Sequence, residues 1–285
     1  MYFKPAGKLI MNPNSAFPSC RPETAASRRT AVERLIIAMR QRVDEPMSLQ
    51  FMARKAMVSS SHLDRIFRQA TGISPRRFMG ALRLASAKSM LLNTQLKVID
   101  ICLAAGYNSL GTFTRRFTEL VGVPPQHLRR LPEKGMLAHM RSLHREAATP
   151  PVNRRNGVRG RVTAPSGFSG PIFVGLFDSP IPEGRPAKCA ILSGPGVFSI
   201  HGIPDRPCYV FAMGFSWSED PLAYLGNDSA LRASAQPPAW NTGGSTEVVL
   251  HLRPPELSDP PILVAIPALV AARFAQQHRE NLVVA

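Results

Sequence analysis

The sequence predicts a multidomain α plus β protein, with an all-helical N-terminal half and a β-rich C-terminal half. The chain of 285 residues is too long for one ordinary domain and suits two. Apolar residues recur at helical spacing between residues 30 and 130, whereas beyond residue 158 they alternate with period two. The positive charge is concentrated in the helical half. Between residues 21 and 145, 22 Lys and Arg stand against 8 Asp and Glu, but from residue 161 onward the counts are 8 and 10.

The net charge of +16 and its uneven distribution indicate a polyanionic partner for the helical half. An anionic membrane surface is the alternative polyanion, but no lysine-rich amphipathic helix is evident. The start of the chain lacks the apolar run of a secretory signal, and the run from Ile262 to Ala275 is too short to span a bilayer. The four cysteines form no CxxC pair or tight cluster, so we expect a reduced, cytoplasmic protein.

The helical half begins with an apolar stripe at helix spacing, formed by Val32, Leu35, Ile36, Met39 and Val43. Pro46 breaks this helix, and Ser48 can cap a short second one. Ser59 or Ser60 starts a third helix, which Gly72 ends.

A long central helix follows. Ser74 and Pro75 form a strong start signal, and the pattern continues to about Leu92. This segment has two apolar stripes, so we expect it to lie between two subdomains. Another short helix then ends at Gly106, and Ser109 caps a further one that ends at Gly122. The order short helix, turn, short helix therefore occurs twice, which predicts a duplicated helix-turn-helix.

The second helix of each motif has a polar face opposite its apolar stripe, where a DNA major groove would meet it. Arginine can bond bidentately to guanine O6 and N7, so Arg65 and Arg115 are the leading base-reading candidates. The alternative is that both are solvated charges on a helical bundle. Their equivalent positions in two copies of one motif favour the DNA-reading interpretation. Further arginines and a helix-start serine are phosphate-contact candidates: Ser60, Arg68, Arg76, Arg77, Arg83, Arg116 and Arg129.

The stretch SLQFMARKAMVSSSHLDRIFRQATGISPRRFMGALRLASAKSMLLN resembles the first half of the AraC/XylS-type DNA-binding domain. The stretch VIDICLAAGYNSLGTFTRRFTELVGVPPQHLRR resembles the second half. The resemblance implies that bases are read by Ser61, His62, Asp64 and Arg65 in the first motif and by Leu110, Gly111, Thr112, Thr114 and Arg115 in the second. Gly111 departs from the family, which often has a polar side chain there. The second motif is therefore expected to rely more on Arg115 and on phosphates.

The C-terminal half contains five β-rich runs separated by Gly and Pro turns: GVRGRVTA, PIFVGLFD, GVFSI, CYVFAMGF and TEVVLHL. They predict a small antiparallel β-sandwich. The series GRVTA, IFVGLFD and PGVFSIHGIPDRPCYVFAMGF is similar to transthyretin-like or carboxypeptidase-regulatory domains. This similarity implies a domain with a binding or structural role rather than a catalytic one. The expected units are a flexible tail (1–28), the double helix-turn-helix (29–131), a linker that can include a short helix (132–156), the β-sandwich (157–256) and a C-terminal extension (257–285).

No catalytic site is evident in the sequence. Repair methyltransferases sometimes share this DNA-binding module, but Cys208 is followed by Tyr209 rather than by the histidine that such a site needs. Cys189 is isolated and is expected to be a packed strand cysteine. The histidines show no metal-ligand spacing, and the glycines at 194 and 196 precede a strand rather than a helix. We therefore expect no enzyme activity, no cofactor and no metal.

Two functional hypotheses follow. The first is a sequence-specific transcription factor that reads two successive major grooves of double-stranded DNA in bacteria. The alternative is an architectural DNA-binding protein with little sequence preference, which the charge and Gly111 favour. RNA polymerase and a small-molecule effector at the C-terminal domain are further partners that the architecture allows. The operator, the effector, the oligomeric state and the choice between activator and repressor stay open.

Overall fold

The structure is a computed structural model that describes residues 25–133, 157–204, 206, 208–226, 229–235 and 245–266. Most of the expected tail, nearly all of the expected linker with its short helix, and the extension beyond residue 266 lie outside these residues.

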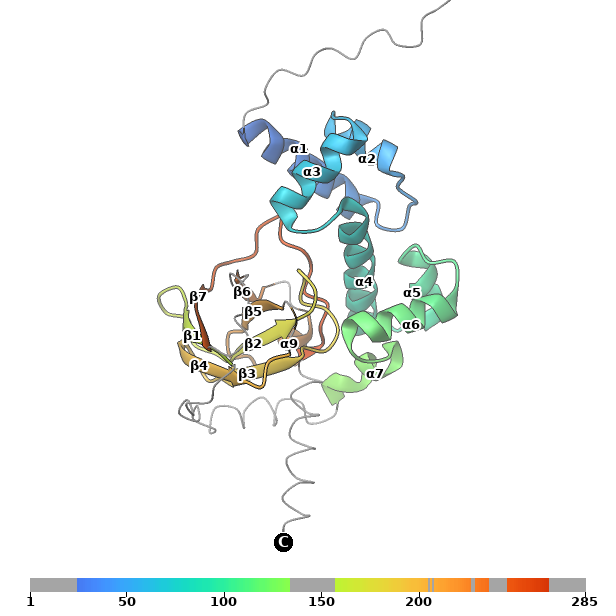
Figure 1. The fold of residues 1–285 in the computed structure, drawn as a ribbon. Helices are drawn as coiled ribbons and strands as arrows, with labels where there is room; N and C mark the ends of the chain where they lie inside the picture. Colours follow the sequence, from blue (N-terminus) through green and yellow to red (C-terminus); the bar gives the residue numbers. More distant parts are fainter. Residues whose placement is uncertain are drawn as a thin grey trace, which may run out of the picture.

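The helical half surrounds one long central helix, α4 (Pro75–Asn93). Helices α1 (Ala25–Gln41), α2 (Leu49–Ala56) and α3 (Ser60–Thr71) lie at its N-terminal end. Helices α5 (Val98–Ala104), α6 (Leu110–Val121) and α7 (Pro125–Arg130) lie at its other end, and α7 continues into the 3-10 turn Leu131–Glu133 (Figure 1). The predicted repeat of two short helices is thus confirmed, as α2–α3 and α5–α6.

Local sequence signals set the ends of these helices. Four serine hydroxyls each accept a hydrogen bond from the backbone N–H three residues later, and they belong to Ser48, Ser59, Ser74 and Ser109. Ser59, rather than Ser60, is the cap of α3. Gly72 and Gly122 end α3 and α6 with φ of 78° and 91°, a left-handed conformation that favours glycine. The predicted caps of α2, α3, α4 and α6 and the stops at Gly72 and Gly122 are therefore confirmed, whereas α1 ends at Gln41, before Val43 and Pro46.

Helix α1 begins at Ala25, earlier than the expected start at Thr30. The apolar stripe starts only where the helix meets the core, so it does not mark the first turns. Those turns contain the good helix formers Ala25 and Ala26, and an ion pair of 2.8 Å between Arg29 and Glu33 joins residues four apart.

The C-terminal half forms two sheets. One has the strand order β4 (Gly196–His201), β1 (Gly157–Thr163), β7 (Ser245–His251). The other has the order β3 (Lys188–Leu192), β2 (Ile172–Phe177), β5 (Tyr209–Gly214), β6 (Leu231–Ala235). A single turn of helix, α9 (Leu222–Leu225), lies between β5 and β6. The expectation of wholly antiparallel sheets is wrong, because β1 pairs with β7 in parallel.

Both faces of β2 are buried, since all six of its residues are buried. On one side, Val174 and Leu176 share an apolar cluster with β1, β4 and β7 residues such as Val158 and Leu250. On the other side, Phe173 and Phe177 belong to a cluster that continues into the helical half. The helical and β halves therefore share part of one core.

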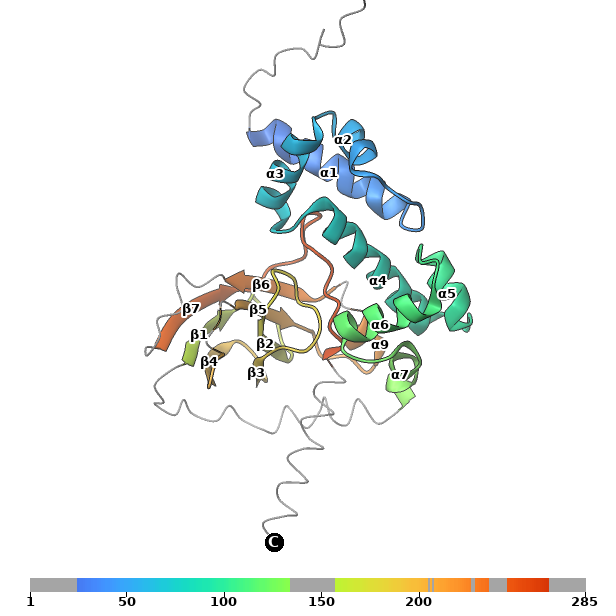
Figure 2. The same ribbon diagram turned by 45° about the vertical axis from the view of Figure 1, so that its right-hand side comes forward.

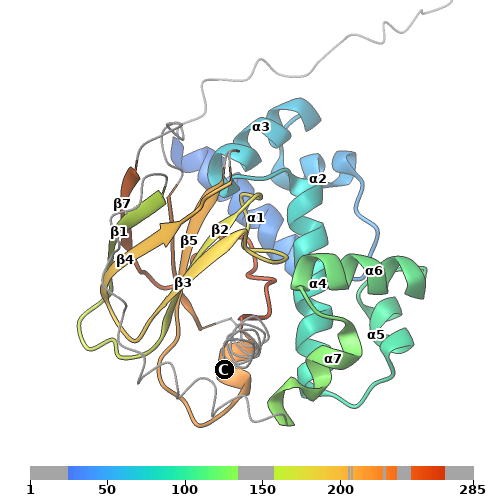
Figure 3. The same ribbon diagram turned by 60° about the horizontal axis from the view of Figure 1, so that its bottom comes forward.

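Residues 262–266 lie between the two halves and are buried. The Leu263 N–H donates to the Pro182 carbonyl at 3.0 Å, and the Ala265 N–H donates to the Val121 carbonyl at 2.9 Å. Figures 1 and 2 show the chain after β7 reaching the α3–α4 junction and then descending between the strands and α4. Figure 3 shows the strands as a block beside α4 and α7. The described part of the expected C-terminal extension therefore packs between the halves.

Candidate nucleic-acid interface

Of the two candidate recognition helices, α3 packs directly on α4, whereas α6 packs on α5 and α7, which in turn pack on α4. Phe67 of α3 makes an edge-on contact with Phe78 of α4, with ring centroids 5.4 Å apart. In the second motif, Phe113 contacts Tyr107 and Phe117 at 5.3 and 5.5 Å. All of these phenylalanines are buried, which fixes the inner face of each helix and leaves the opposite face exposed.

The outer face of α3 brings the first set of base-reading candidates together. Ser61 and Arg65 are exposed, and His62 and Asp64 are half-buried. Arg65 Nη2 lies 3.3 Å from His62 Nδ1, and Arg68 Nε donates to the Asp64 carboxylate at 2.7 Å. The face is therefore a continuous polar surface in which Arg68 also orders Asp64.

The outer face of α6 brings the second set together. Leu110, Gly111, Thr112 and Arg115 are exposed, and Thr114 is half-buried. This face carries an open hollow whose lining includes Leu110, Gly111, Thr114, Arg115, Thr118 and Glu119. A Cβ at Gly111 would have no atom nearer than Ser109 Oγ at 4.0 Å, so glycine is not required there by packing.

Glu119 is a residue of this face that sequence reasoning missed. It stands four residues after Arg115 and is exposed. A carboxylate can accept a hydrogen bond from cytosine N4, so the residue type suits base reading. Its spacing of one helical turn from Arg115 is the signal that would have found it.

Two of the phosphate-contact candidates, Arg83 and Arg129, donate to backbone carbonyls within the helical half. Arg83 Nε and Nη2 donate to the carbonyls of Val43 and Glu45 at 2.9 and 2.8 Å. Arg129 donates to the carbonyls of Leu91 and Leu96 at 3.3 and 2.6 Å. Both guanidinium groups thus tie a loop to the helical core, which the residue type alone does not reveal.

Arg77, near the start of α4, contacts the β half. Its Nη2 lies 2.5 Å from Glu183 Oε1 and 2.6 Å from Ser179 Oγ. The Glu183 side chain is only 9% exposed, whereas that of Arg77 is 42% exposed. The Glu183 carboxylate of the β half therefore already binds Arg77, a side chain expected to contact a DNA phosphate.

Arg77 lines a groove of about 420 Å³ between α4 and α6. Arg76 and Arg116 also line it, together with the carboxylate-bearing Glu119 and Glu183. Arg116 lies beside Tyr107; burial raises the pKa of the Tyr107 phenol, and the guanidinium opposes that rise. Ser60, on the first turn of α3, is half-buried, and Arg68 and Arg76 are exposed. The groove is thus a polar surface between α4 and α6 of the second motif.

The cysteines of the described residues show no reactive arrangement. Cys102 and Cys208 are buried, and burial raises the pKa of both thiols, with Asp178 adding to the rise at Cys208. Such thiols are protonated and poorly nucleophilic near neutral pH. Cys189 lies on strand β3 but is exposed, so the expectation that it is packed is wrong. Within the described ranges, no group of three His, Cys, Asp or Glu side chains is placed to hold a metal ion.

Comparison with known proteins shows which kind of domain the helical half contains. Residues 52–131 match the family model described as a helix-turn-helix domain. The chain is 35% identical over 99 residues to the right origin-binding protein of Escherichia coli, which covers 35% of this chain and 34% of that protein. It is 28% identical over 95 residues to the HTH-type transcriptional regulator GbdR of Pseudomonas aeruginosa, covering 33% of this chain and 26% of that regulator. Residues 52–131 form a helix-turn-helix domain.

A solved structure is similar to about a third of the chain. It is a transcriptional regulator with an AraC-type DNA-binding domain from Chromobacterium violaceum, at 27% identity and a TM-score of 0.35, covering 36% of this chain and 93% of that one. The chain spans between a quarter and a third of the length of these curated relatives. No helix in the described part of the chain is long and apolar enough to cross a membrane.

Proposed function

We propose that this protein is a sequence-specific DNA-binding transcription regulator that reads two successive major grooves with α3 and α6. The observation that carries this proposal is the pair of outward polar faces on equivalent helices of the helix-turn-helix domain, with α3 packed on α4 and α6 joined to α4 through α5 and α7. Helices fixed to one rigid element can enter major grooves about 34 Å apart on one face of the duplex. The relatives named as transcriptional regulators support the same function.

Within this proposal, Arg65 and Arg115 read guanine edges, and their exposed neighbours contact adjacent bases. These neighbours are Ser61, His62, Asp64, Leu110, Gly111, Thr112 and Thr114, to which we add Glu119. Arg76, Arg77 and Arg116 hold the phosphates between the two grooves, with Ser60 and Arg68 beside the first motif. Arg83 and Arg129 act by fixing the shape of the surface rather than by meeting phosphates.

We also infer that the C-terminal strands form a two-layer sandwich that senses a ligand or contacts a partner, as in transthyretin-like domains. The shared apolar cluster between the two sheets supports this inference. RNA polymerase is a further proposed partner. The units proposed are the helix-turn-helix over residues 29–131 and the β unit over 157–256, joined by the segment 132–156.

An architectural protein that coats DNA is the second candidate, because Gly111 removes a base-reading side chain from α6. Hydroxyl-radical footprinting on a duplex enriched from a random pool separates the two. A sequence reader protects two backbone segments one helical turn apart, at a fixed place on the duplex. Protection that shifts among positions on the same duplex would support the architectural candidate and contradict the proposed function.

A further inference from the structure

A cavity of about 500 Å³ lies between the helical and β halves, and none of the candidate base-reading residues lines it. Its helical wall is the end of α3, at residues 70–72. Its opposite wall comes from β5, β6 and β7, and the segment 258–262 completes it. Sites for small organic molecules commonly have volumes of about 300–1,000 Å³, and they occur preferentially at domain interfaces.

The walls of the cavity combine an apolar surface with a few polar groups. Tyr209, Phe211 and Met213 of β5, together with Val249 and Ile262, supply the apolar part. Such a surface suits the aromatic or aliphatic body of a small molecule.

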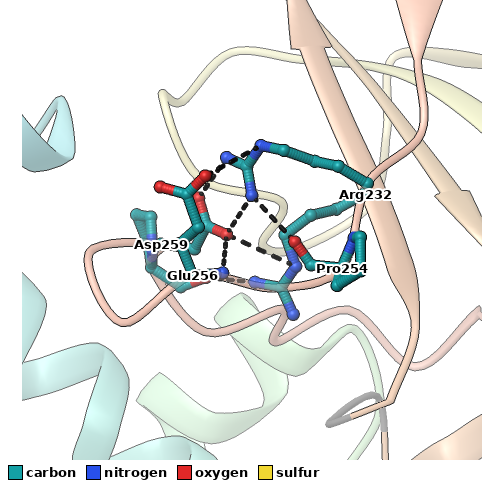
Figure 4. Close-up of polar contacts among 6 residues, drawn as sticks. Arg232, Pro254, Glu256 and Asp259 are labelled. Atoms are coloured by element: carbon teal, nitrogen blue, oxygen red, sulfur yellow. Dashed lines mark hydrogen bonds and ion pairs between the residues drawn. The ribbon is translucent and has the colours of Figure 1, made fainter.

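Two arginines share one half-buried carboxylate in the wall. Arg232 and Arg253 face each other across a β-bridge, each backbone N–H donating to the carbonyl of the other. Arg253 makes two hydrogen bonds of 2.8 Å to Asp259, and Arg232 Nε lies 3.9 Å from the same carboxylate (Figure 4). The side chains of Arg232 and Asp259 are 14% and 15% exposed. The position of Arg232 is fixed further by its hydrogen bond to the Pro260 carbonyl at 3.1 Å.

This wall carries a net positive charge. Its charged side chains are Arg232, Arg253 and Asp259, which makes two guanidinium groups and one carboxylate. Glu256 lies 3.6 Å from Arg253, but its side chain is 49% exposed and it does not line the cavity. A guanidinium group binds a carboxylate through directed hydrogen bonds, so an anionic group suits this wall best.

We propose that this cavity binds a small organic carboxylate whose apolar body rests on Tyr209, Phe211 and Met213 and whose anionic group meets Arg232. Because the walls come from both halves, a bound molecule stabilises their docked arrangement. That arrangement also places Glu183 on Arg77. The consequence for DNA binding rests on the proposed function, whereas the binding of the carboxylate itself does not.

The test uses the full chain without DNA and three probes of matched shape: 4-phenylbutyrate, 4-phenylbutanol and 4-phenylbutylamine. Isothermal titration and thermal unfolding are recorded at millimolar probe concentration. We expect 4-phenylbutyrate to bind with one-to-one stoichiometry and raise Tm, and to bind at least about tenfold more tightly than the alcohol, because a hydrogen bond to a charged group is stronger than a neutral one. The amine should bind more weakly still.

Three variants locate the site. Arg232→Gln removes the charge, Ser234→Leu fills the cavity from β6, and Lys188→Gln removes a charge from β3, at the opposite edge of the same sheet. The first two should lose at least about tenfold in affinity for 4-phenylbutyrate, and Lys188→Gln should bind like wild type. Circular dichroism shows whether each variant is folded. If Arg232→Gln does not fold, the affinity of Ser234→Leu for 4-phenylbutyrate decides the result.

Absence of 4-phenylbutyrate binding would overturn the proposal. Equal binding of the three probes would also overturn it, since the cavity would then not select an anion. Unchanged affinity in Ser234→Leu would place the bound probe elsewhere and have the same effect. None of these outcomes bears on DNA binding, so the proposed function is judged separately.

Discussion

The ion pair between Arg77 and Glu183 predicts that the β half weakens DNA binding. For Arg77 to contact a DNA phosphate, its ion pair with Glu183 must first break. A hydrogen bond between charged groups contributes about 1.5–3 kcal/mol when it is buried. Arg77 is 42% exposed, so we expect solvent to reduce the contribution to about 1 kcal/mol. The substitution Glu183→Gln keeps the side-chain shape and removes the charge.

We therefore expect Glu183→Gln to raise DNA affinity about fivefold, since 1.4 kcal/mol corresponds to a factor of ten. The slope of log K against log salt concentration should steepen by about 0.9, the value for one additional phosphate contact. Fluorescence anisotropy with a labelled duplex at several potassium chloride concentrations measures both quantities.

Two further variants control for simpler explanations. Glu247→Gln makes the same change in net charge at an exposed position on β7. It should leave the slope unchanged. In an Arg77→Ala background, Glu183→Gln should no longer steepen the slope. The reasoning is refuted if Glu183→Gln behaves like Glu247→Gln, or if its effect persists without Arg77.

Three other predictions concern stability, each measured by urea or thermal unfolding. Arg83→Ala should destabilise the protein by about 1–2 kcal/mol, because it removes two hydrogen bonds that are only partly shielded from water. Arg76→Ala should leave stability nearly unchanged and lower only the salt slope of DNA binding, and equal stability of the two variants would contradict this. Met57 has φ of 60°, a left-handed conformation that is unfavourable for a side chain, so Met57→Gly should stabilise by about 0.5–1 kcal/mol, and a loss of stability would be the opposing result. Burial alone would raise the pKa of Asp259, but hydrogen bonds from Arg253 and from the Glu256 N–H lower it overall. A carboxyl with a lowered pKa stabilises the fold above its unfolded pKa and loses that contribution as pH falls through the folded value. Wild type should therefore lose Tm more steeply than Asp259→Asn below about pH 4, and parallel curves would contradict this.

The features that the sequence predicts well are those set by neighbouring residues. Ser59, Ser74 and Gly122 act through hydrogen bonds and backbone angles within a few positions, so they can be recognised from the letters alone. The outward faces of α3 and α6 follow from helical period in the same way.

Features that depend on distant partners were not predictable. Strand β6, with the sequence LRASA, has little intrinsic β preference and forms by pairing with β5. Strand β3 was missed as well, because it is short and lies at a sheet edge. The sequence does not distinguish an arginine that contacts a phosphate from one that, like Arg83, donates to a loop carbonyl. The parallel pairing of β1 with β7 joins strands more than 80 residues apart, which no local pattern encodes.

The most direct test of the central claim is selection of duplexes from a random pool at near-physiological salt. Wild type, Arg65→Ala and Arg115→Ala are compared side by side. We expect wild type to return a defined consensus and each variant to relax it at one position, since a bidentate arginine contributes about 1–3 kcal/mol of discrimination. The two relaxed positions should lie about one helical turn apart, one in each half of the site. A wild-type pool without a consensus, or an unchanged consensus in both variants, would contradict base reading by α3 and α6.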